Sequence, residues 1–232
     1  MNTLAFDTCF GACSVAVTWS AGGSSGGAYR YEPLERGHAE RLMPMIGEAM
    51  GEAPFDFSRI ERIVVTTGPG TFTGQRVGIA AARALSLATG APVYSETSLA
   101  VMAAGAAFEI GAELAGKVLA VAVDARRGEV YFQAFKGADL APLAAPQLLT
   151  PEQAVRALAG SDVVAVGSGA EALSALAPEI GVSVAARLGS LQPDVRFLPD
   201  RVFASEPGLP RPLYLRPPDA KPQAGAAYAR VS

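Results

Sequence analysis

Residues 61–90 read ERIVVTTGPGTFTGQRVGIAAARALSLATG, and this stretch decides the fold. The run IVVT at 63–66 predicts a short buried strand, and the glycine-proline-glycine that follows predicts a sharp turn. Thr71 or Thr73 can cap a helix over 74–88, which a glycine then ends. A strand, a glycine turn and a helix in this order can point backbone N–H groups at an anion. The stretch therefore predicts an α/β unit, either with a phosphate site at the turn or as a core helix with no ligand.

The glycine spacing argues against two familiar nucleotide motifs. From Gly68 it reads GxGxxxG rather than the GxGxxG of dinucleotide-binding folds, and the chain has no GxxxxGK[ST] phosphate loop. The helix at 74–88 is apolar nearly all round, whereas a surface helix usually keeps one polar face. We therefore expect it to be covered on most sides.

Composition limits the classes of function. The chain has 232 residues and a net charge of −3, so we do not expect it to bind nucleic acid tightly by itself. The start, MNTLAFDT, has no basic segment followed by an apolar run, and no apolar stretch reaches the roughly 18 residues of a membrane span. Two cysteines make no disulfide framework. A cytoplasmic enzyme or subunit is expected, without a membrane partner.

The chain opens with an antiparallel meander. Strands are expected at 3–7, 14–19 and 28–33, with a turn over the glycine-serine stretch 21–27. Asp7 and Thr8 stand where the first strand meets its turn. A carboxylate there could hold a hydrated Mg²⁺ near a phosphate, or could simply accept hydrogen bonds from turn amides.

A helix is expected over 38–50. Its apolar stripe is formed by Leu42, Met45, Ile46 and Ala49, and Met43 and Met50 widen that stripe on one flank. His38, the single histidine, is expected to cap the helix or lie on the surface. With Cys9 and Cys13 it does not complete a zinc ligand set.

The pattern of the first hairpin recurs at 118–136, where VLAVAVDARRGEVYFQAF again reads strand, carboxylate, short turn, strand. Asp7 and Asp124 hold equivalent places, which indicates a duplicated lobe. Arg126, Arg127 and Glu129 make the second turn bulky and leave less room for a phosphate. Further elements are expected as a strand at 91–95, helices at 97–107 and 151–159, a strand at 162–166, a last strand or docking segment at 213–215, and a mobile tail from 217.

Five stretches in this order carry a family resemblance. They are LAFDTCFGACSVAV, RGHAERLMPMI, TGPGTFTGQRVGIAAARALSLATGAPV, VDARRGEVY and PLYLR, of which the glycine-loop stretch is the most specific. The sequence resembles the TsaB (YeaZ) family over roughly residues 2–218. The resemblance implies an α/β, two-lobed actin-like ATPase (ASKHA, ribonuclease H-like) fold with duplicated mixed β-sheet lobes. An N-terminal lobe over 1–107, a C-terminal lobe over 108–216 and a tail over 217–232 are then expected.

The resemblance also implies a function. The family's catalytic paralogue, TsaD, transfers a threonylcarbamoyl group from its adenylate to N6 of adenosine 37 in tRNA. TsaB proteins bind TsaD and are required for that activity, and an ATPase, TsaE, joins them. We therefore expect a non-catalytic subunit of the transferase complex that forms a homodimer when alone and meets tRNA only through the complex.

Two expectations about sites accompany the resemblance. Weak, degenerate nucleotide-binding residues are expected at Asp7, Thr8, Gly68, Gly70 and Thr71, with no resident cofactor, although ATP or ADP at the complex is possible. The partner interface is expected on the helices at 38–50 and 74–88, with the residues Leu42, Met43, Met45, Ile46, Met50, Gly78, Ala81, Ala82 and Leu85.

The metal site of the paralogue has no counterpart here. TsaD carries an HxxxH pair shortly after the helix that follows its glycine loop, and alignment on Pro92-Val93 puts Ser95 and Leu99 at those places. Neither side chain can replace an imidazole at a metal. No metal site is therefore expected, and the missing ligands argue against the metallopeptidase label sometimes attached to this superfamily.

Two enzyme classes remain as alternatives. One is an ATP-dependent small-molecule kinase of the same fold class that uses Asp7 and the glycine loop, although the second turn is not small. The other is a nicotinamide dehydrogenase with Glu96 on the ribose, against which the glycine spacing and the opening meander both count.

Overall fold

The computed structural model describes residues 1–21, 24–137, 139–198, 202–203 and 205–216. They form two five-stranded mixed sheets with the same topology, β3-β2-β1-β4-β5 and β8-β7-β6-β9-β10. The strands of the first are β1 Thr3–Asp7, β2 Ala12–Ala21, β3 Ser24–Pro33, β4 Arg62–Thr66 and β5 Val93–Glu96. Those of the second are β6 Val118–Asp124, β7 Val130–Lys136, β8 Gln147–Leu149, β9 Asp162–Val166 and β10 Ser183–Arg187. Each sheet pairs an antiparallel meander with parallel strands, which confirms the predicted duplication.

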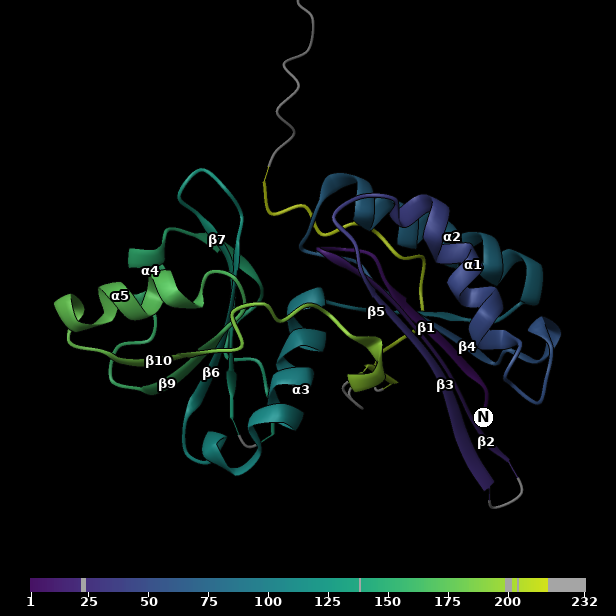
Figure 1. Ribbon diagram of the computed structural model, residues 1–232, viewed down its shortest axis with the longest axis horizontal. Helices are drawn as coiled ribbons and strands as arrows, with labels where there is room; N and C mark the ends of the chain where they lie inside the picture. Colours follow the sequence, from purple (N-terminus) through teal and green to yellow (C-terminus); the bar gives the residue numbers. More distant parts are fainter. Residues whose placement is uncertain (22–23, 138, 199–201, 204, 217–232) are drawn as a thin grey trace, which may run out of the picture.

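The first lobe is the sheet β1–β5 with helices α1 (His38–Met50) and α2 (Phe72–Thr89) on one face (Figure 1). Alternate residues of each strand point to that face, as Leu4 and Phe6 of β1 do, and form one apolar cluster with the inner sides of both helices. The bounds of α2 follow from local chemistry. Thr71 caps its start by accepting the N–H of Gly74, and Gly90 ends it with a positive φ of 76°.

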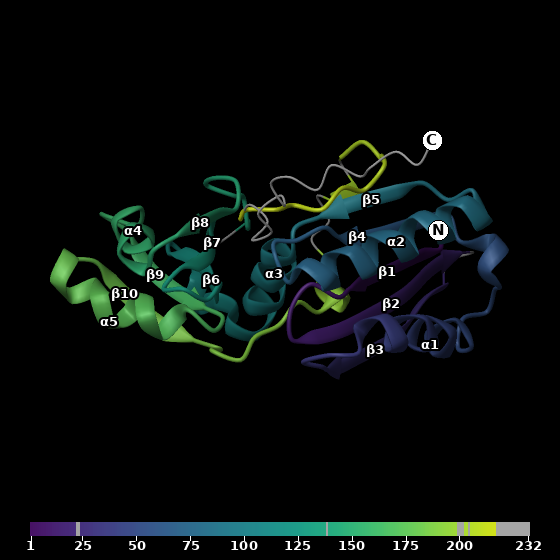
Figure 2. The ribbon, with the colours of Figure 1, turned by 90° about the horizontal axis from the view of Figure 1, so that it is seen from above.

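The second lobe is the sheet β6–β10 with α4 (Pro151–Arg156) and α5 (Ala170–Ile180) on one face. Helix α3 (Ser98–Ile110) covers the other face and lies between the two lobes in both views (Figures 1 and 2). The cluster around α3 also includes Cys9 and Phe10 from the turn after β1. The apolar cluster around α3 therefore contains residues from both lobes.

The chain after β10 returns to the first lobe. Val195 and Val202 pack against Ala5, Ala16 and Val64 on the face of the first sheet that α1 and α2 leave open. The segment continues along β5, where the N–H of Gly208 donates to the carbonyl of Val93 at 2.9 Å. This return could not be predicted from sequence because the segment is irregular and has no periodicity. The predicted tail at 217–232 lies outside the described residues.

Three local predictions need revision, and one alternative is decided. Part of the stretch predicted as a turn over 21–27 is strand, and Gly26 allows it because the Trp19 ring lies within 2.4 Å of where a Cβ would stand. Helix α4 ends at Arg156, earlier than predicted. Of the two alternatives predicted for 213–215, the structure has the docking segment and not the strand, with the N–H of Leu213 donating to the carbonyl of Thr67 at 2.8 Å. His38 neither caps α1 nor lies on the surface: it is buried, and its Nε2 pairs with the carbonyl of Phe10 at 2.9 Å.

No helix within the described ranges is long and apolar enough to cross a membrane.

Candidate functional site

The glycine loop after β4 is packed tightly against the turn after β1. A Cβ at Gly70 would stand 2.4 Å from the carbonyl oxygen of Cys9, and one at Gly74 would stand 2.0 Å from that of Thr8. The N–H of Thr71 donates to the carbonyl of Cys9 at 2.8 Å, and the Thr8 hydroxyl donates to the carbonyl of Gly74 at 2.7 Å. These glycines therefore permit contact between two backbone segments, which is a structural role for their small size.

Asp7 is fully buried beneath this loop. Its carboxylate accepts hydrogen bonds from the Thr66 hydroxyl and from the N–H of Cys9, the latter at 3.2 Å. Burial raises the pKa of Asp7 from its ordinary value of 3.8 to about 6, and the two hydrogen bonds oppose the rise only in part. The geometry is that of a carboxyl group held by turn amides, the alternative that the sequence left open.

The turn after β1 is covered by other parts of the chain. The Gln192 side chain accepts the N–H of Gly11 at 2.8 Å, and the Phe10 ring lies 6.0 Å from the Tyr131 ring of the second lobe, centroid to centroid. The structure thus brings together the predicted nucleotide-binding residues Asp7, Thr8, Gly68, Gly70 and Thr71. All except Thr71 are buried. They form a packed loop and not an open cleft.

The candidate metal and ribose positions have other surroundings. Leu99 is buried in the core around α3, and Ser95 is exposed at the end of β5. The Glu96 carboxylate accepts the N–H of its neighbour Thr97 at 2.7 Å. Among the described residues, no three His, Cys, Asp or Glu side chains lie close enough together to hold a metal ion.

Most of the residues predicted at the partner interface are instead core residues of the first lobe. Leu42, Met45, Ile46, Met50, Gly78, Ala82 and Leu85 are buried within the monomer. Of the two methionines predicted to widen the stripe, Met50 is 6% exposed and Met43 is 47% exposed. The sequence pattern could not separate them because periodicity locates a stripe better than its edges. Ala81 is half-buried.

Helix α2 nevertheless presents an apolar outer surface that the sequence pattern did not resolve. It consists of Val77, Ala80, Ala81, Ala84 and Leu87, which recur at the spacing of one helix face and are half-buried or exposed. We call these five residues the α2 face. Leu87 is 89% exposed, and Met43 lies on the neighbouring helix α1. No acidic residue occurs in α2. The expectation that α2 is covered on most sides is thus not met within the monomer.

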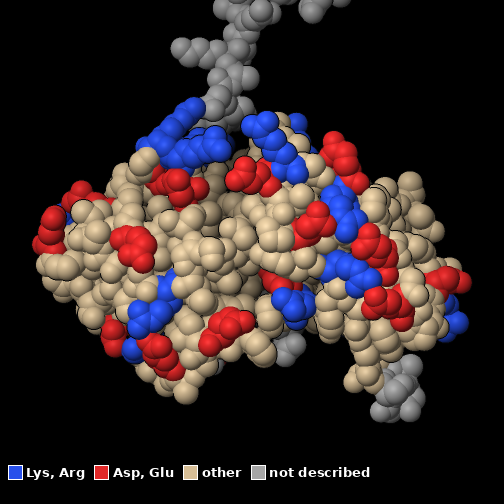
Figure 3. All heavy atoms as spheres, viewed as in Figure 1, with Lys and Arg blue, Asp and Glu red and all other residues tan. Residues whose placement is uncertain are grey.

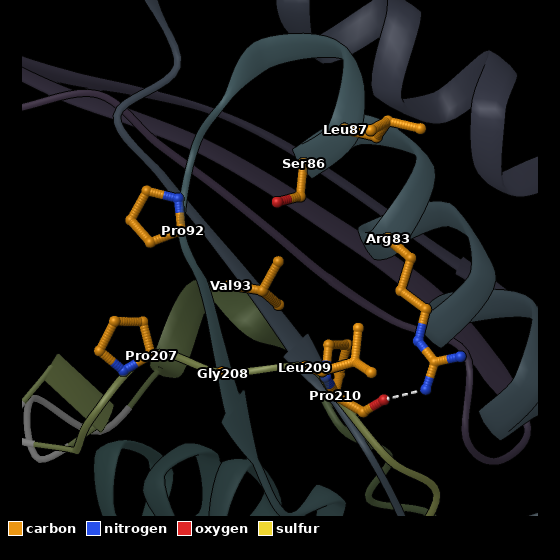
Figure 4. A pocket seen from close by; sticks show the side chains of 9 residues that line it. All are labelled: Arg83, Ser86, Leu87, Pro92, Val93, Pro207, Gly208, Leu209 and Pro210. Atoms are coloured by element: carbon orange, nitrogen blue, oxygen red, sulfur yellow. Dashed lines mark hydrogen bonds between the residues drawn. The ribbon is translucent and has the colours of Figure 1, made fainter.

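A groove of about 430 Å³ borders the end of the α2 face. It lies between α2, the start of β5 and the returning segment 207–210 (Figure 4). The Arg83 guanidinium lies along one side of it and donates to the carbonyl of Pro210 at 2.6 Å. Leu87 and Leu209, both largely exposed, form part of its lining, so the apolar surface of α2 continues into the groove.

Comparison with known proteins places these features in a family. The TsaD family profile, described as tRNA N6-adenosine threonylcarbamoyltransferase, matches residues 32–190. The tRNA threonylcarbamoyladenosine biosynthesis protein TsaB of Escherichia coli K12 is 33% identical over 190 residues, which are 78% of each chain. The TsaB protein of Haemophilus influenzae is 32% identical over 184 residues, which are 75% of each chain.

Solved structures agree. YeaZ from Pseudomonas aeruginosa superimposes with a TM-score of 0.76 at 28% identity, covering 92% of this chain and 99% of that one. A second structure from that organism, described as similar to peptidase YEAZ, gives a TM-score of 0.75 at 29% identity, covering 93% and 99%. With its duplicated sheets, the chain has the same two-lobed α/β fold as these YeaZ structures.

Proposed function

The chain belongs to the TsaB (YeaZ) family, and from that premise we propose that it is a non-catalytic subunit in tRNA threonylcarbamoyladenosine biosynthesis. It binds a TsaD-like transferase and enables that enzyme to modify adenosine 37 of tRNA. A TsaE-like ATPase joins the assembly, which works in the cytoplasm. The names of the relatives support a role in tRNA threonylcarbamoyladenosine biosynthesis. The geometry of this chain supports a non-catalytic role in that process.

The α2 face is the observation that carries the proposal. Leu87 is almost completely exposed and lies beside a run of alanines on the same helix face. A contiguous exposed apolar surface of this kind is typical of a protein interface. The small residues Ala80, Ala81 and Ala84 let the backbone of a partner helix come close. The proposed interface is thus the α2 face with Met43, narrower than the set predicted from sequence. The same surface can pair two copies of the chain when the transferase is absent.

The packed glycine loop supports a non-catalytic role. Asp7 has no solvent contact, and the turn amide of Gly11 that could receive a phosphate is bonded to Gln192. A nucleotide would have to displace these contacts before it reached the loop. The chemistry is therefore assigned to the TsaD-like partner, with any ATP or ADP at the complex held outside this loop.

Reconstitution with the chain's own TsaD-like and TsaE-like partners tests the proposal. Mixtures with and without this chain should differ in the threonylcarbamoyladenosine they form on a tRNA transcript, and the chain with tRNA and the adenylate alone should form none. Modification by the isolated chain, or full activity without it, would contradict the proposal.

Single substitutions that place a charge in the proposed interface test its position. Met43→Asp and Ala84→Asp should each weaken TsaD binding by about tenfold or more, because a carboxylate would be left in an apolar contact. Both variants should also shift any homodimer to monomer in analytical ultracentrifugation. Leu143→Asp is the matched control, since Leu143 is 50% exposed on the second lobe. Folded variants that bind the transferase as tightly as the control would place the interface elsewhere.

A further inference from the structure

Residues 213–216 fasten the two lobes together at one edge of the molecule. On the first lobe, Arg76 of α2 donates from Nε to the Tyr214 hydroxyl at 2.7 Å. On the second, Arg216 donates to the carbonyl of Ala125 at 2.9 Å and forms an ion pair with Glu129. The β6–β7 turn and α2 are thereby linked through this segment, although they lie far apart in the sequence.

Two aromatic rings are displayed on the first-lobe side of this contact. Phe72 is 50% exposed and Tyr214 is 40% exposed, and their rings stack with centroids 5.4 Å apart and planes 24° apart. The Arg76 guanidinium lies 3.6 Å from the centre of the Phe72 ring. A flat pair of exposed rings braced by an arginine is a preorganised stacking platform.

The second-lobe side carries two exposed arginines on a strained turn. Arg126 and Arg127 both adopt positive φ, at 62° and 58°, a region that favours glycine and asparagine. Such backbone strain persists where the surrounding structure enforces it, and it concentrates at functional sites. Both side chains are exposed on this turn, so their charge is open to a ligand.

The charge of this edge opposes that of the whole chain. We call Phe72, Arg76, Arg126, Arg127, Tyr214 and Arg216 the arginine–aromatic rim. Figure 3 shows basic side chains gathered at the upper edge, over the end of the β6–β7 hairpin and the neighbouring part of the first lobe. Among the described acidic residues here, Glu129 is paired with Arg216 and Asp124 accepts the backbone N–H of Arg126. A chain with a net charge of −3 thus has a locally cationic edge.

We propose that the arginine–aromatic rim binds RNA, with the arginines on backbone phosphates and the Phe72–Tyr214 platform under an unstacked base. Arginine recognises phosphate with several donors, and exposed aromatic rings receive the splayed bases of single-stranded loops. An acidic protein segment would use the arginines but not the flat ring pair. The identification of the RNA as tRNA rests on the proposed function. The inference that the rim binds RNA rests on the chemistry of its residues and does not depend on that function. The rim adds its contacts within the complex, since its few charges are too weak for tight binding by the isolated chain.

A double variant removes the charge without harming the turn. Arg126→Asn with Arg127→Gly suits the positive φ values, so the variant should fold at least as well as the wild type. Arg156→Gln with Arg187→Gln is the matched control, because it removes the same charge from exposed positions on α4 and β10. A third variant, Tyr214→Phe, removes the hydrogen bond to Arg76 but keeps the ring, and Tyr214→Ala removes both.

The measurement is binding of a fluorescent, unmodified tRNA transcript to the complex of this chain with the TsaD-like subunit, at several salt concentrations. The turn variant should bind about tenfold more weakly and lower the salt slope by about 1.4, the expectation for two single-strand phosphate contacts. Tyr214→Ala should cost about tenfold, and Tyr214→Phe much less. The control pair should bind as the wild type does.

Other outcomes overturn the inference. Unchanged tRNA affinity and salt slope in the turn variant would remove the RNA role. Loss of TsaE-like ATPase binding with unchanged tRNA affinity would identify the rim as a protein-docking surface instead. A pull-down without RNA tests the proposed function separately. If the chain does not bind the TsaD-like subunit there, the proposed function is wrong whatever the tRNA measurements show. Ultraviolet crosslinking of tRNA to the wild-type chain, compared with the turn variant, then still reports on the rim.

Discussion

The carboxyl group of Asp7 links the stability of the fold to pH. Its pKa is about 6 in the folded chain, above the ordinary value of 3.8, because burial disfavours the charged form. Because its pKa is higher in the folded than in the unfolded chain, protonated Asp7 stabilises the fold below about pH 4. This contribution to the unfolding free energy is lost as the pH rises through 6. Relative to Asp7→Asn, the wild type should lose on the order of 3 kcal/mol of unfolding free energy between pH 4 and pH 7. Urea unfolding of both proteins at four pH values measures the difference, and parallel pH profiles would contradict it.

Gly74 tests whether the glycine loop is a packing device. A methyl group there would meet the carbonyl oxygen of Thr8 at 2.0 Å, so Gly74→Ala should lower the unfolding free energy by about 3 kcal/mol. Gly47, in the exposed part of α1, is the matched control because nothing lies within 4 Å of the place where its Cβ would stand. Gly47→Ala should raise stability by about 0.5–1 kcal/mol, since alanine is the better helix former. Equal effects at both glycines would show that the loop has room.

At the scale of elements, the two methionines Met43 and Met50 lie two turns apart on α1, one exposed and the other buried. Met50 is buried at 6% exposure and Met43 is 47% exposed. Met50→Asp should therefore cost about 3 kcal/mol or more of stability, because it removes a buried apolar side chain and leaves a buried charge. Met43→Asp should change stability by less than about 0.5 kcal/mol, the usual range for surface positions. Thermal unfolding compares them, and a Met43 variant that melts as early as the Met50 variant would place both side chains in the core.

The elements also show what a sequence can predict. Helix α2 and its neighbouring strand were predictable because a capping threonine, a terminal glycine and β-branched residues each act locally. The length of β3 was not, since it depends on the Trp19 ring covering Gly26 from the next strand. The outer surface of α2 was hidden for a related reason: a helix that is apolar all round does not reveal which side the monomer covers.

At the scale of the whole molecule, the two lobes are joined by contacts between residues far apart in sequence. The Gln192 side chain reaches the turn after β1, and the Ser14 hydroxyl, hydrogen-bonded to the carbonyl of Pro193 at 3.2 Å, fastens the same segment. Segment 191–216 was predicted in the second lobe because it follows that lobe in the chain. Its path is set by the open face of the first sheet, and nothing in its own composition records that face.

Gln192 distinguishes the proposed subunit from an ATP-dependent kinase of the same fold. In a kinase, a phosphate would take the N–H of Gly11 that Gln192 now accepts, so removing the side chain would strengthen ATP binding. We expect instead that Gln192→Ala speeds hydrogen exchange of the Gly11 amide and lowers stability by about 1 kcal/mol, without creating an ATP site. The reason is that Phe10 still contacts Tyr131 and Gly70 still packs on Cys9, so no space for a triphosphate opens. Isothermal titration of wild type and variant with Mg-ATP should give no binding heat in either. Micromolar ATP binding by the variant would mean that the Gln192 side chain alone blocks a nucleotide-binding cleft. An ATP-dependent kinase would then be the better assignment of function for this chain.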